Sequence, residues 1–279
     1  MNVAIIGIGL IGGSMAMALR EKKIASKIIG VDANEMHRQK AIELGLVDEV
    51  TDLEKAIKES DLIVLCVPVG AAESILSAIL LQVKKQVIMD VGSTKSSIAQ
   101  IAGQHEKGRR FVATHPMWGT EFSGPSAAVS GAFIDKAVVI CNKENSDSDA
   151  LEQVEKIYRQ LGMHIIYMDS TAHDVHAAYI SHISHITSFA LANTVLEKEK
   201  EDDAIFELAS GGFESTVRLA KSNPDMWVPI LMQNKENVLD VLNEHISQLR
   251  KFKSCLEKEN FEYLAELIQN ANTINRILK

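Results

Sequence analysis

The sequence is poor in cysteine and lacks long apolar runs. Only three cysteines occur in 279 residues, at the widely spaced positions Cys66, Cys141 and Cys255. They form neither a disulfide framework nor the close spacing of zinc ligands, so we expect reduced thiols in a cytoplasmic protein. No apolar run is long enough to span a bilayer, and we therefore expect no membrane partner.

Positive charge is also scarce. The chain has 29 Lys and Arg residues against 37 Asp and Glu residues, which gives a formal net charge of −8. This balance provides no electrostatic reason to expect nucleic acid or an anionic membrane surface as a partner. With 46% hydrophobic and 24% charged residues, the composition is that of a folded globular protein. The length allows one large domain or two modest ones.

The most informative stretch lies at the start of the chain. An apolar run at 3–6 is followed by Gly7, Gly9 and Gly12 in the spacing G-x-G-x-x-G, and a second apolar run ends at Asp32. Such glycines allow a sharp strand-to-helix turn, a close approach of the backbone to a pyrophosphate, and tight helix–strand packing. The free N–H groups at the helix start then face the phosphates. The stretch predicts a dinucleotide-binding site.

The end of the second apolar run indicates which dinucleotide is bound. Asp32 is placed to accept hydrogen bonds from the adenosine ribose hydroxyls. No arginine directly follows it to accommodate a 2′-phosphate, so the sequence favours NAD over NADP. Arg38 lies a few residues further on and keeps NADP open as an alternative.

Strand and helix patterns alternate over the first 170 residues. The strands are continuously apolar, which is typical of a parallel sheet covered by helices on both faces. This pattern indicates an α/β, Rossmann-type doubly wound sheet. Beyond the two strands of the glycine motif, we expect strands at 61–67, 86–91, 111–114, 137–141 and 163–168, and helices at 14–22, 34–44, 53–59, 71–83, 96–104 and 147–161.

Ligands bind at the carboxyl ends of the strands in such a sheet. That rule brings Gly7, Asp32, Val67, Ser93 and His115 to one edge. His115 directly follows a buried strand and is placed to act as a general base, or alternatively to cap a loop. Ser93 could contact substrate or nicotinamide, or it could cap the next helix.

From residue 171 the strand patterns stop and helical ones take over. Thr171 with Asp174 three residues later resembles a capping box. We therefore predict two domains, an NAD-binding domain at 1–170 and an all-helical domain at 171–279 that binds substrate. Large apolar helix faces at the end of such a chain favour pairing with a second copy, so a homodimer is expected. The predicted long helices span 171–198, 225–256 and 261–277.

Four histidines crowd the first long helix. At about 100° per residue, His173 and His176 share one face, whereas His182 and His185 lie on a roughly opposite face. This geometry argues against a single four-histidine metal site, and we expect no metal. His182 and His185 are either a functional pair or hydrogen-bonded core or interface residues.

Two further side chains in the helical part are candidates for ligand binding. Arg218 could clamp a carboxylate through two parallel hydrogen bonds, or it could be an exposed arginine on a solvated helix. Trp227 could contact a ligand, although tryptophan is more often found in a core or an interface.

Taken together, these residues resemble the prephenate/arogenate dehydrogenase family of tyrosine biosynthesis over nearly the whole chain. The sequence departs from the family pattern at three residues: Phe122 replaces a lysine that many members carry, and Glu214-Ser215 stands where Lys-Asp is frequent. The shared motifs are Gly7 to Ser14, Gly92-Ser93-x-Lys95, His115-Pro116-Met117-x-Gly119-Thr120-Glu121-x-Ser123-Gly124, Ser181 to His185, Gly212-Phe213 with Arg218, and Pro224-x-Met226-Trp227.

The resemblance implies roles for individual residues. His115 would be the catalytic base at the ring hydroxyl and Ser93 would assist it, while Glu121 would serve as a gate or charge partner. The implied substrate-binding residues are Arg218, which would hold a carboxylate, and His185, His182, Glu121, Thr120 and Trp227. The implied cofactor-binding residues are Gly7, Gly9, Leu10, Ile11, Gly12, Asp32, Val67, Pro68 and Ser93.

The resemblance also implies a reaction, the NAD-dependent oxidative decarboxylation of prephenate to 4-hydroxyphenylpyruvate. A proton leaves the ring hydroxyl, hydride leaves the same carbon, and loss of carbon dioxide makes the ring aromatic. Three alternatives stay open: an arogenate or dual-specificity cyclohexadienyl dehydrogenase, a 3-hydroxyacid dehydrogenase on the same fold, and a non-catalytic NAD sensor.

Overall fold

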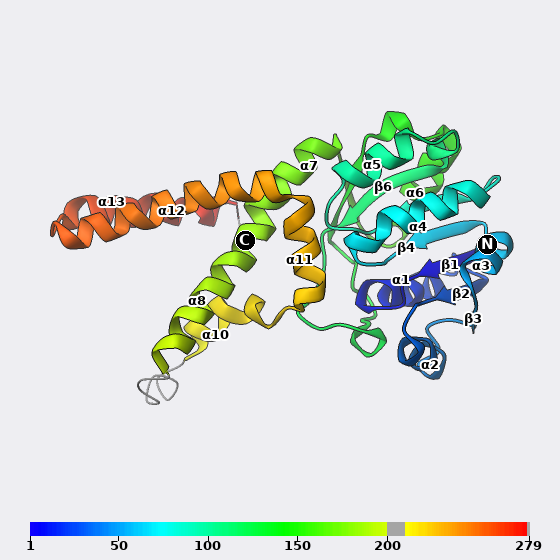
Figure 1. Ribbon diagram of the computed structural model, residues 1–279, viewed down its shortest axis with the longest axis horizontal. Helices are drawn as coiled ribbons and strands as arrows, with labels where there is room; N and C mark the ends of the chain where they lie inside the picture. Colours follow the sequence, from blue (N-terminus) through cyan, green and yellow to red (C-terminus); the bar gives the residue numbers. More distant parts are fainter. Residues whose placement is uncertain (200–209, 278–279) are drawn as a thin grey trace.

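A single mixed sheet organises the first part of the chain, with a helical part beside it (Figure 1). The computed structural model describes residues 1–199 and 210–277. Within them the strand order is β3-β2-β1-β4-β5-β6-β7-β8. The strands are β1 (Asn2–Ile6), β2 (Lys27–Val31), β3 (Glu49–Val50), β4 (Leu62–Leu65), β5 (Val87–Asp90), β6 (Phe111–Pro116), β7 (Ala137–Cys141) and β8 (His164–Met168).

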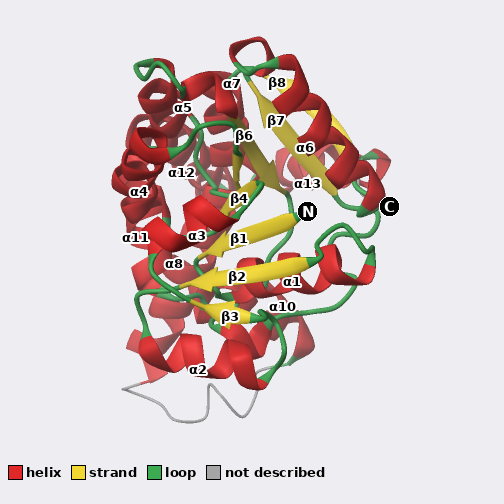
Figure 2. Cartoon of the chain, turned by 90° about the vertical axis from the view of Figure 1, so that its right-hand side faces the viewer, coloured by secondary structure: helices red, strands yellow, loops and turns green. Residues whose placement is uncertain are grey.

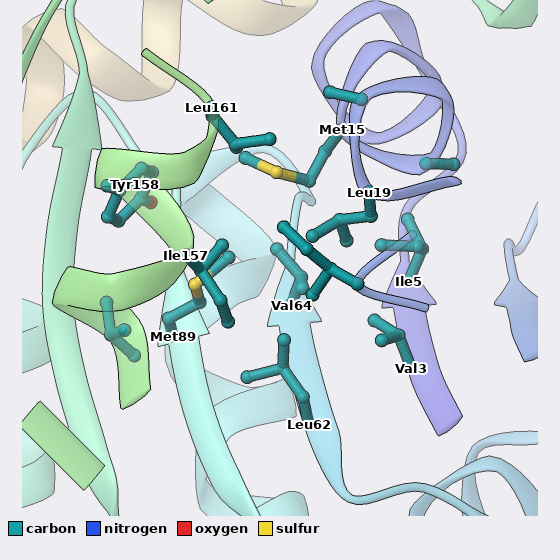
Figure 3. Close-up of a cluster of buried hydrophobic side chains, with 14 of the residues drawn as sticks. Val3, Ile5, Met15, Leu19, Leu62, Val64, Met89, Ile157, Tyr158 and Leu161 are labelled. Carbon is teal, nitrogen blue, oxygen red and sulfur yellow. The ribbon is translucent and has the colours of Figure 1, made fainter. Parts of the chain in front are cut away.

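Helices cover both faces of this sheet (Figure 2). On β1, Val3 and Ile5 pack in a cluster with residues of α1 and α6, whereas Ala4 and Ile6 pack in one with residues of α3, α4 and α5. Alternate strand residues point to opposite faces, so a strand that is buried on both sides must be continuously apolar. Figure 3 shows the first cluster. The helices are α1 (Leu10–Glu21), α2 (Glu35–Glu43), α3 (Leu53–Glu59), α4 (Val69–Gln82), α5 (Ser96–Gly103) and α6 (Ser148–Gln160).

The predicted doubly wound α/β fold is confirmed, and the sheet is mostly parallel as expected, with one antiparallel pairing that the sequence did not predict. Strand β7 runs antiparallel to β6, and β8 runs parallel to β7. The stretch between β6 and β7 contains only a short 3₁₀ turn at Pro125–Ala127. Without a crossover helix the chain returns in the opposite direction, as antiparallel pairs do. The two-residue strand β3 was not expected from the sequence.

The helical part begins directly after β8. Its described elements are α7 (Ser170–Ala177), the π-helical segment η4 (Ala178–His182), α8 (Ile183–Glu199), α10 (Gly211–Val217), α11 (Pro224–Gln233), α12 (Lys235–Glu257) and α13 (Phe261–Asn272). Helices α12 and α13 project away from the sheet (Figure 1). Leu249, Leu256 and Phe261 are among the large apolar side chains that they expose.

Three predicted helix features need correction. Asp169, rather than Thr171, caps α7, because its carboxylate accepts a hydrogen bond from the N–H of Ala172 at 2.8 Å. The helix expected at 171–198 is interrupted by the π-helical segment. The helix expected at 225–256 breaks at Asn234, whose backbone leaves the helical conformation (φ −103°, ψ 25°).

The three cysteines are free thiols. Within the described ranges, the search for a helix with the length and apolar character needed to cross a bilayer finds none.

Candidate active site

The glycine turn between β1 and α1 has the geometry that a dinucleotide needs. Gly7 has φ +95°, and a Cβ there would lie 2.6 Å from the carbonyl oxygen of Cys66. A Cβ on Gly12 would overlap the carbonyl oxygen of Gly7, whereas a Cβ on Gly9 would meet no atom of the described residues within 4 Å. Gly7 and Gly12 therefore close the turn, and Gly9 leaves open space above the helix start. Gly9 is also the N-cap of α1 and makes no side-chain cap, so the N–H groups of the first turn, which include Leu10 and Ile11, are directed at this space.

Asp32 lies just beyond β2, next to the glycine turn. Its carboxylate accepts hydrogen bonds from the N–H of Ile8 and the N–H of Asn34, both at 2.8 Å. Its side chain is 11% exposed, and the Nδ1 atom of His37 lies 3.5 Å from it. Arg38 pairs with Glu35 and donates to the carbonyl of Asp32 at 2.9 Å. These contacts hold the carboxylate at the carboxyl end of β2.

The remaining cofactor candidates lie at the same edge. Val67 and Pro68 follow β4, and Pro68 is the N-cap of α4. Ser93 follows β5, which pairs in parallel with β4. The alternative role of Ser93 as a helix cap is wrong, because the N–H groups that open α5 donate to Asp174 instead: Lys95 at 2.7 Å and Ser96 at 2.8 Å.

A buried polar network lies next to this edge of the sheet. The Lys95 ammonium is fully buried, pairs with the carboxylate of Asp90 and donates to the carbonyl of Thr114 at 2.9 Å. Asp90 also accepts from the N–H of Gly92 and the N–H of Thr114, both at 2.9 Å. The hydroxyls of Thr114 and Tyr158 lie 2.6 Å apart. A buried ion pair with its remaining hydrogen bonds satisfied holds strands β5 and β6 in a defined relation.

His115 lies inside β6 rather than after it, because β7 extends the strand pairing as far as Pro116. Its Nδ1 atom is 2.8 Å from Nε2 of His173, and Nδ1 of His173 is 2.8 Å from the carboxylate of Asp174. Within the part of the chain that the structure describes, Nε2 of His115 has no hydrogen-bond partner. Burial, and then the proximity of His173 and of the Lys95 ammonium, hold the pKa of His115 well below its usual value.

His182 and His185 both contact the ring of Trp227. The ring of His185 stacks on Trp227 with centroids 3.5 Å apart, and His182 meets the indole edge-on at 5.8 Å. Trp227 is 7% exposed, and its Nε1 atom is buried without a hydrogen-bond partner in the described residues. Burial lowers the pKa of His182 to about 4 and also lowers that of His185. An unpaired buried N–H is rare in a folded protein, so it marks a place where a ligand could accept a hydrogen bond.

The prediction that His182 lies opposite His173 is wrong. Asn234 donates to the carbonyl of Asp174 at 2.7 Å and contacts Nδ1 of His182 at 3.1 Å, so His173 and His182 reach one hydrogen-bonded cluster. A π-helical segment turns less per residue than an α-helix, and this changes the face on which His182 emerges. His176, expected on the face of His173, is exposed.

Arg218 and Glu121 join the helical part to the loop after β6. Their ion pair is 3.0 Å long, with side-chain exposures of 51% and 15%. The pKa of Glu121 is lowered, first by a hydrogen bond from its own backbone N–H and then by the charge of Arg218. The neighbouring Thr120 hydroxyl accepts from the N–H of Phe122 at 3.3 Å. A surface hollow beside the pair is lined by Glu121, Phe122, Ser123, Ser126, Ala127, Lys221 and Asn223.

The structure therefore places one group of predicted residues at the sheet edge and a second group in the helical part. The sequence did not reveal some of the residues that link the two groups. Lys95 belongs to the Gly92-Ser93-x-Lys95 motif, but the sequence indicates no role for it. Asp174 has the spacing of a capping box with Thr171, which hides its contact with α5. Asn234 carried no recognisable signal, because its partners lie 52 and 60 residues away in the sequence. In the described residues, no group of three or more His, Cys, Asp or Glu side chains is arranged to hold a metal ion.

Comparison with known proteins gives consistent matches over the whole chain. The family model described as the nucleotide-binding domain of prephenate dehydrogenase matches residues 15–167, and the one described as its dimerization domain matches residues 169–270. The cyclohexadienyl dehydrogenase of Zymomonas mobilis is 31% identical, with 100% of this chain and 96% of the relative covered. The prephenate dehydrogenase of Bacillus subtilis is 30% identical, with 97% and 74% covered.

Solved structures agree with this assignment. The prephenate dehydrogenase of A. aeolicus, in complex with hydroxyphenyl propionate and NAD⁺, superposes with a TM-score of 0.91 at 29% identity, covering 100% of this chain and 98% of that one. The arogenate dehydrogenase of Synechocystis gives a TM-score of 0.80 at 28% identity, with both chains covered completely. The chain therefore belongs to the prephenate dehydrogenase family.

Proposed function

We propose that the chain is an NAD-dependent prephenate dehydrogenase, which oxidises and decarboxylates prephenate to 4-hydroxyphenylpyruvate. The observation that carries the proposal is the placement of His115. In the described part of the chain its Nε2 atom has no hydrogen-bond partner, and His115 lies at the sheet edge that also carries the glycine turn and Asp32. A base for the ring hydroxyl and a site for a dinucleotide thus share one edge.

The residues present fit NAD. Open space above Gly9, the uncapped start of α1 and the carboxylate of Asp32 match a pyrophosphate and a ribose diol. Val67, Pro68 and Ser93 border the same edge. When bound, NAD accepts the hydride from the carbon that bears the hydroxyl.

The chain's own residues supply proton removal and orientation. His115 takes the proton from the ring hydroxyl, and Ser93 assists at the same group. Arg218 holds a substrate carboxylate, with Glu121 as its partner in the absence of substrate. The Nε1–H of Trp227, which has no hydrogen-bond partner in the described residues, donates to the substrate. Positioning and charge pairing lower the barrier to aromatisation.

We further propose that residues 1–170 bind NAD and residues 171–279 bind substrate and pair two copies of the chain. The matched dimerization domain supports this division. The projecting helices α12 and α13 expose apolar side chains that a second copy would cover, including Leu249, Leu256 and Phe261.

A direct assay tests the proposed function. Purified protein is mixed with NAD and either prephenate or arogenate, and NADH absorbance is followed. We expect faster formation of NADH with prephenate. Faster formation with arogenate would assign the chain to arogenate or dual-specificity enzymes, a reading supported by the match to a cyclohexadienyl dehydrogenase. Absence of NADH with both substrates would contradict the proposal.

A further inference from the structure

Three side chains form a continuous hydrogen-bonded row behind the candidate base. The carboxylate of Asp174 meets Nδ1 of His173 at 2.8 Å, and Nε2 of His173 meets Nδ1 of His115 at 2.8 Å. The side chains of His173 and Asp174 are only 3% and 6% exposed. Water therefore does not compete for these hydrogen bonds, and the buried donors and acceptors of these side chains must pair with one another.

The charge of Asp174 settles the direction of each hydrogen bond. Both of its oxygens accept from backbone N–H groups, those of Lys95 and Ser96 at the start of α5. Burial works against its charged form, but hydrogen bonds from His173 and Ser96 outweigh burial and lower the pKa of Asp174. The group is therefore a carboxylate, which can only accept hydrogen bonds.

The tautomers of both histidines follow from that charge. Because Asp174 only accepts, Nδ1 of His173 carries the hydrogen, and the neutral ring then has a lone pair on Nε2. This lone pair accepts the Nδ1–H of His115. The Nε2 atom of His115 is consequently left with its own lone pair, and it is the atom without a partner in the described residues.

We propose that His173 and Asp174 are positioning residues that hold His115 in the tautomer able to accept a proton at Nε2, and that they stabilise the imidazolium formed there. In the step considered, the bond from the substrate hydroxyl oxygen to hydrogen breaks, and its electron pair stays on oxygen. The proton joins Nε2 of His115, and the Nδ1–H of the same ring stays hydrogen-bonded to His173. The proposal rests on the proposed function for this step, whereas the tautomer assignment does not.

The surroundings of His115 show why such support is needed. Burial opposes its protonation most strongly, and the neighbouring His173, the Lys95 ammonium and His182 add to that effect. The negative charge of Asp174 favours protonation. Lys95 is neutralised in part by Asp90. An imidazolium formed at this position is thus stabilised by Asp174 acting through His173, as a buried carboxylate does behind the histidine of a hydrolase triad.

Two substitutions of His173 separate positioning from simple packing. His173→Leu removes both hydrogen bonds, and we expect kcat to fall roughly 10²-fold or more, since the wrong tautomer of His115 becomes accessible. His173→Gln keeps an amide oxygen for His115 but loses Asp174, so the loss should be smaller. KM and NAD affinity should change less than threefold in both. The matched control is His176→Gln, an exposed histidine one turn further along α7, which should behave as wild type.

Nitrogen NMR of histidine-labelled protein gives a readout that needs no turnover. At neutral pH and without substrate, His115 should show a protonated Nδ1 and an unprotonated Nε2. A protonated Nε2 on neutral His115 in the wild-type protein would overturn the proposal, even if both His173 variants failed to fold. A kcat of folded His173→Leu within threefold of the control would also overturn it. Failure of the proposed function would instead appear as no turnover by wild type together with the expected tautomer.

Discussion

At the scale of single residues, the mechanism depends most on His115. We predict that His115→Asn lowers kcat by roughly 10²–10⁴-fold, because asparagine forms hydrogen bonds but cannot take up the proton. Since the pKa of His115 lies well below 6.5 in the folded protein, the wild-type imidazole is already neutral at pH 7. Its kcat/KM should therefore rise with pH on the acid side and level off below neutrality.

The pH profile of the variant completes this prediction. In His115→Asn the acid limb should disappear from kcat/KM, while NAD binding, measured by fluorescence titration, should be retained. Turnover within a few-fold of wild type would show that the base lies elsewhere, and His185 would be the next residue to test.

Arg218 is predicted to act on substrate affinity. It is half exposed and paired with Glu121, so it is available for exchange onto a substrate carboxylate. Arg218→Ala should raise the KM for prephenate roughly 10- to 100-fold, the usual cost of losing a hydrogen bond between charged groups. The exposed Arg250 on α12 offers a matched control, since Arg250→Ala removes the same charge far along the helix. An unchanged KM in folded Arg218→Ala would identify it as a surface charge.

At the scale of secondary-structure elements, the junction of β2 and α2 is predicted to select the cofactor. The N–H groups of Ile8 and Asn34 hold the Asp32 carboxylate, and Arg38 is engaged with Glu35. A 2′-phosphate would meet a fixed negative charge. We therefore expect NAD to exceed NADP in kcat/KM by at least about tenfold, which corresponds to about 1.4 kcal/mol.

Steady-state rates with both cofactors measure this preference. Asp32→Asn should narrow it, because the repelling charge is removed while the hydrogen-bonding shape is kept. Equal or faster turnover of the wild-type protein with NADP would contradict the prediction and direct attention to Arg38.

At the scale of the whole molecule, buried histidines couple stability to pH. The pKa of His182 is about 4 in the folded protein and near 6.5 when unfolded. Between these values the unfolded chain binds more protons, so the free energy of unfolding falls as pH falls. From pH ~7 to pH ~5, His182 alone should remove about 2 kcal/mol, and carboxylates titrate little in that range.

Urea unfolding at the two pH values tests this. The decrease in unfolding free energy should be about 2 kcal/mol smaller in His182→Asn than in wild type, whereas replacement of the exposed His176 should leave the decrease unchanged. Equal decreases in all three proteins would show that His182 is not buried in its neutral form.

The sequence by itself determined the features that depend on near neighbours in the chain. Apolar runs separated by helical patterns were enough to predict the α/β sheet and the helical part, because periodicity and burial are local properties. The spacing of Gly7, Gly9 and Gly12 was enough to predict the turn, because φ and close packing there exclude other residues. The parallel strands then brought Asp32, Ser93 and His115 to one edge.

Only the tertiary structure decided what distant segments do to one another. No local sequence pattern predicts the reversed direction of β7, the π-helical segment before His182 or the break at Asn234. Local propensity alone favours continuous helices and a parallel strand at these places. Asp174 has the sequence context of a local cap, yet it caps α5, 78 and 79 residues away, and orients His173 behind His115. A buried carboxylate takes whichever donors the packed chain presents, and no spacing in the sequence specifies them.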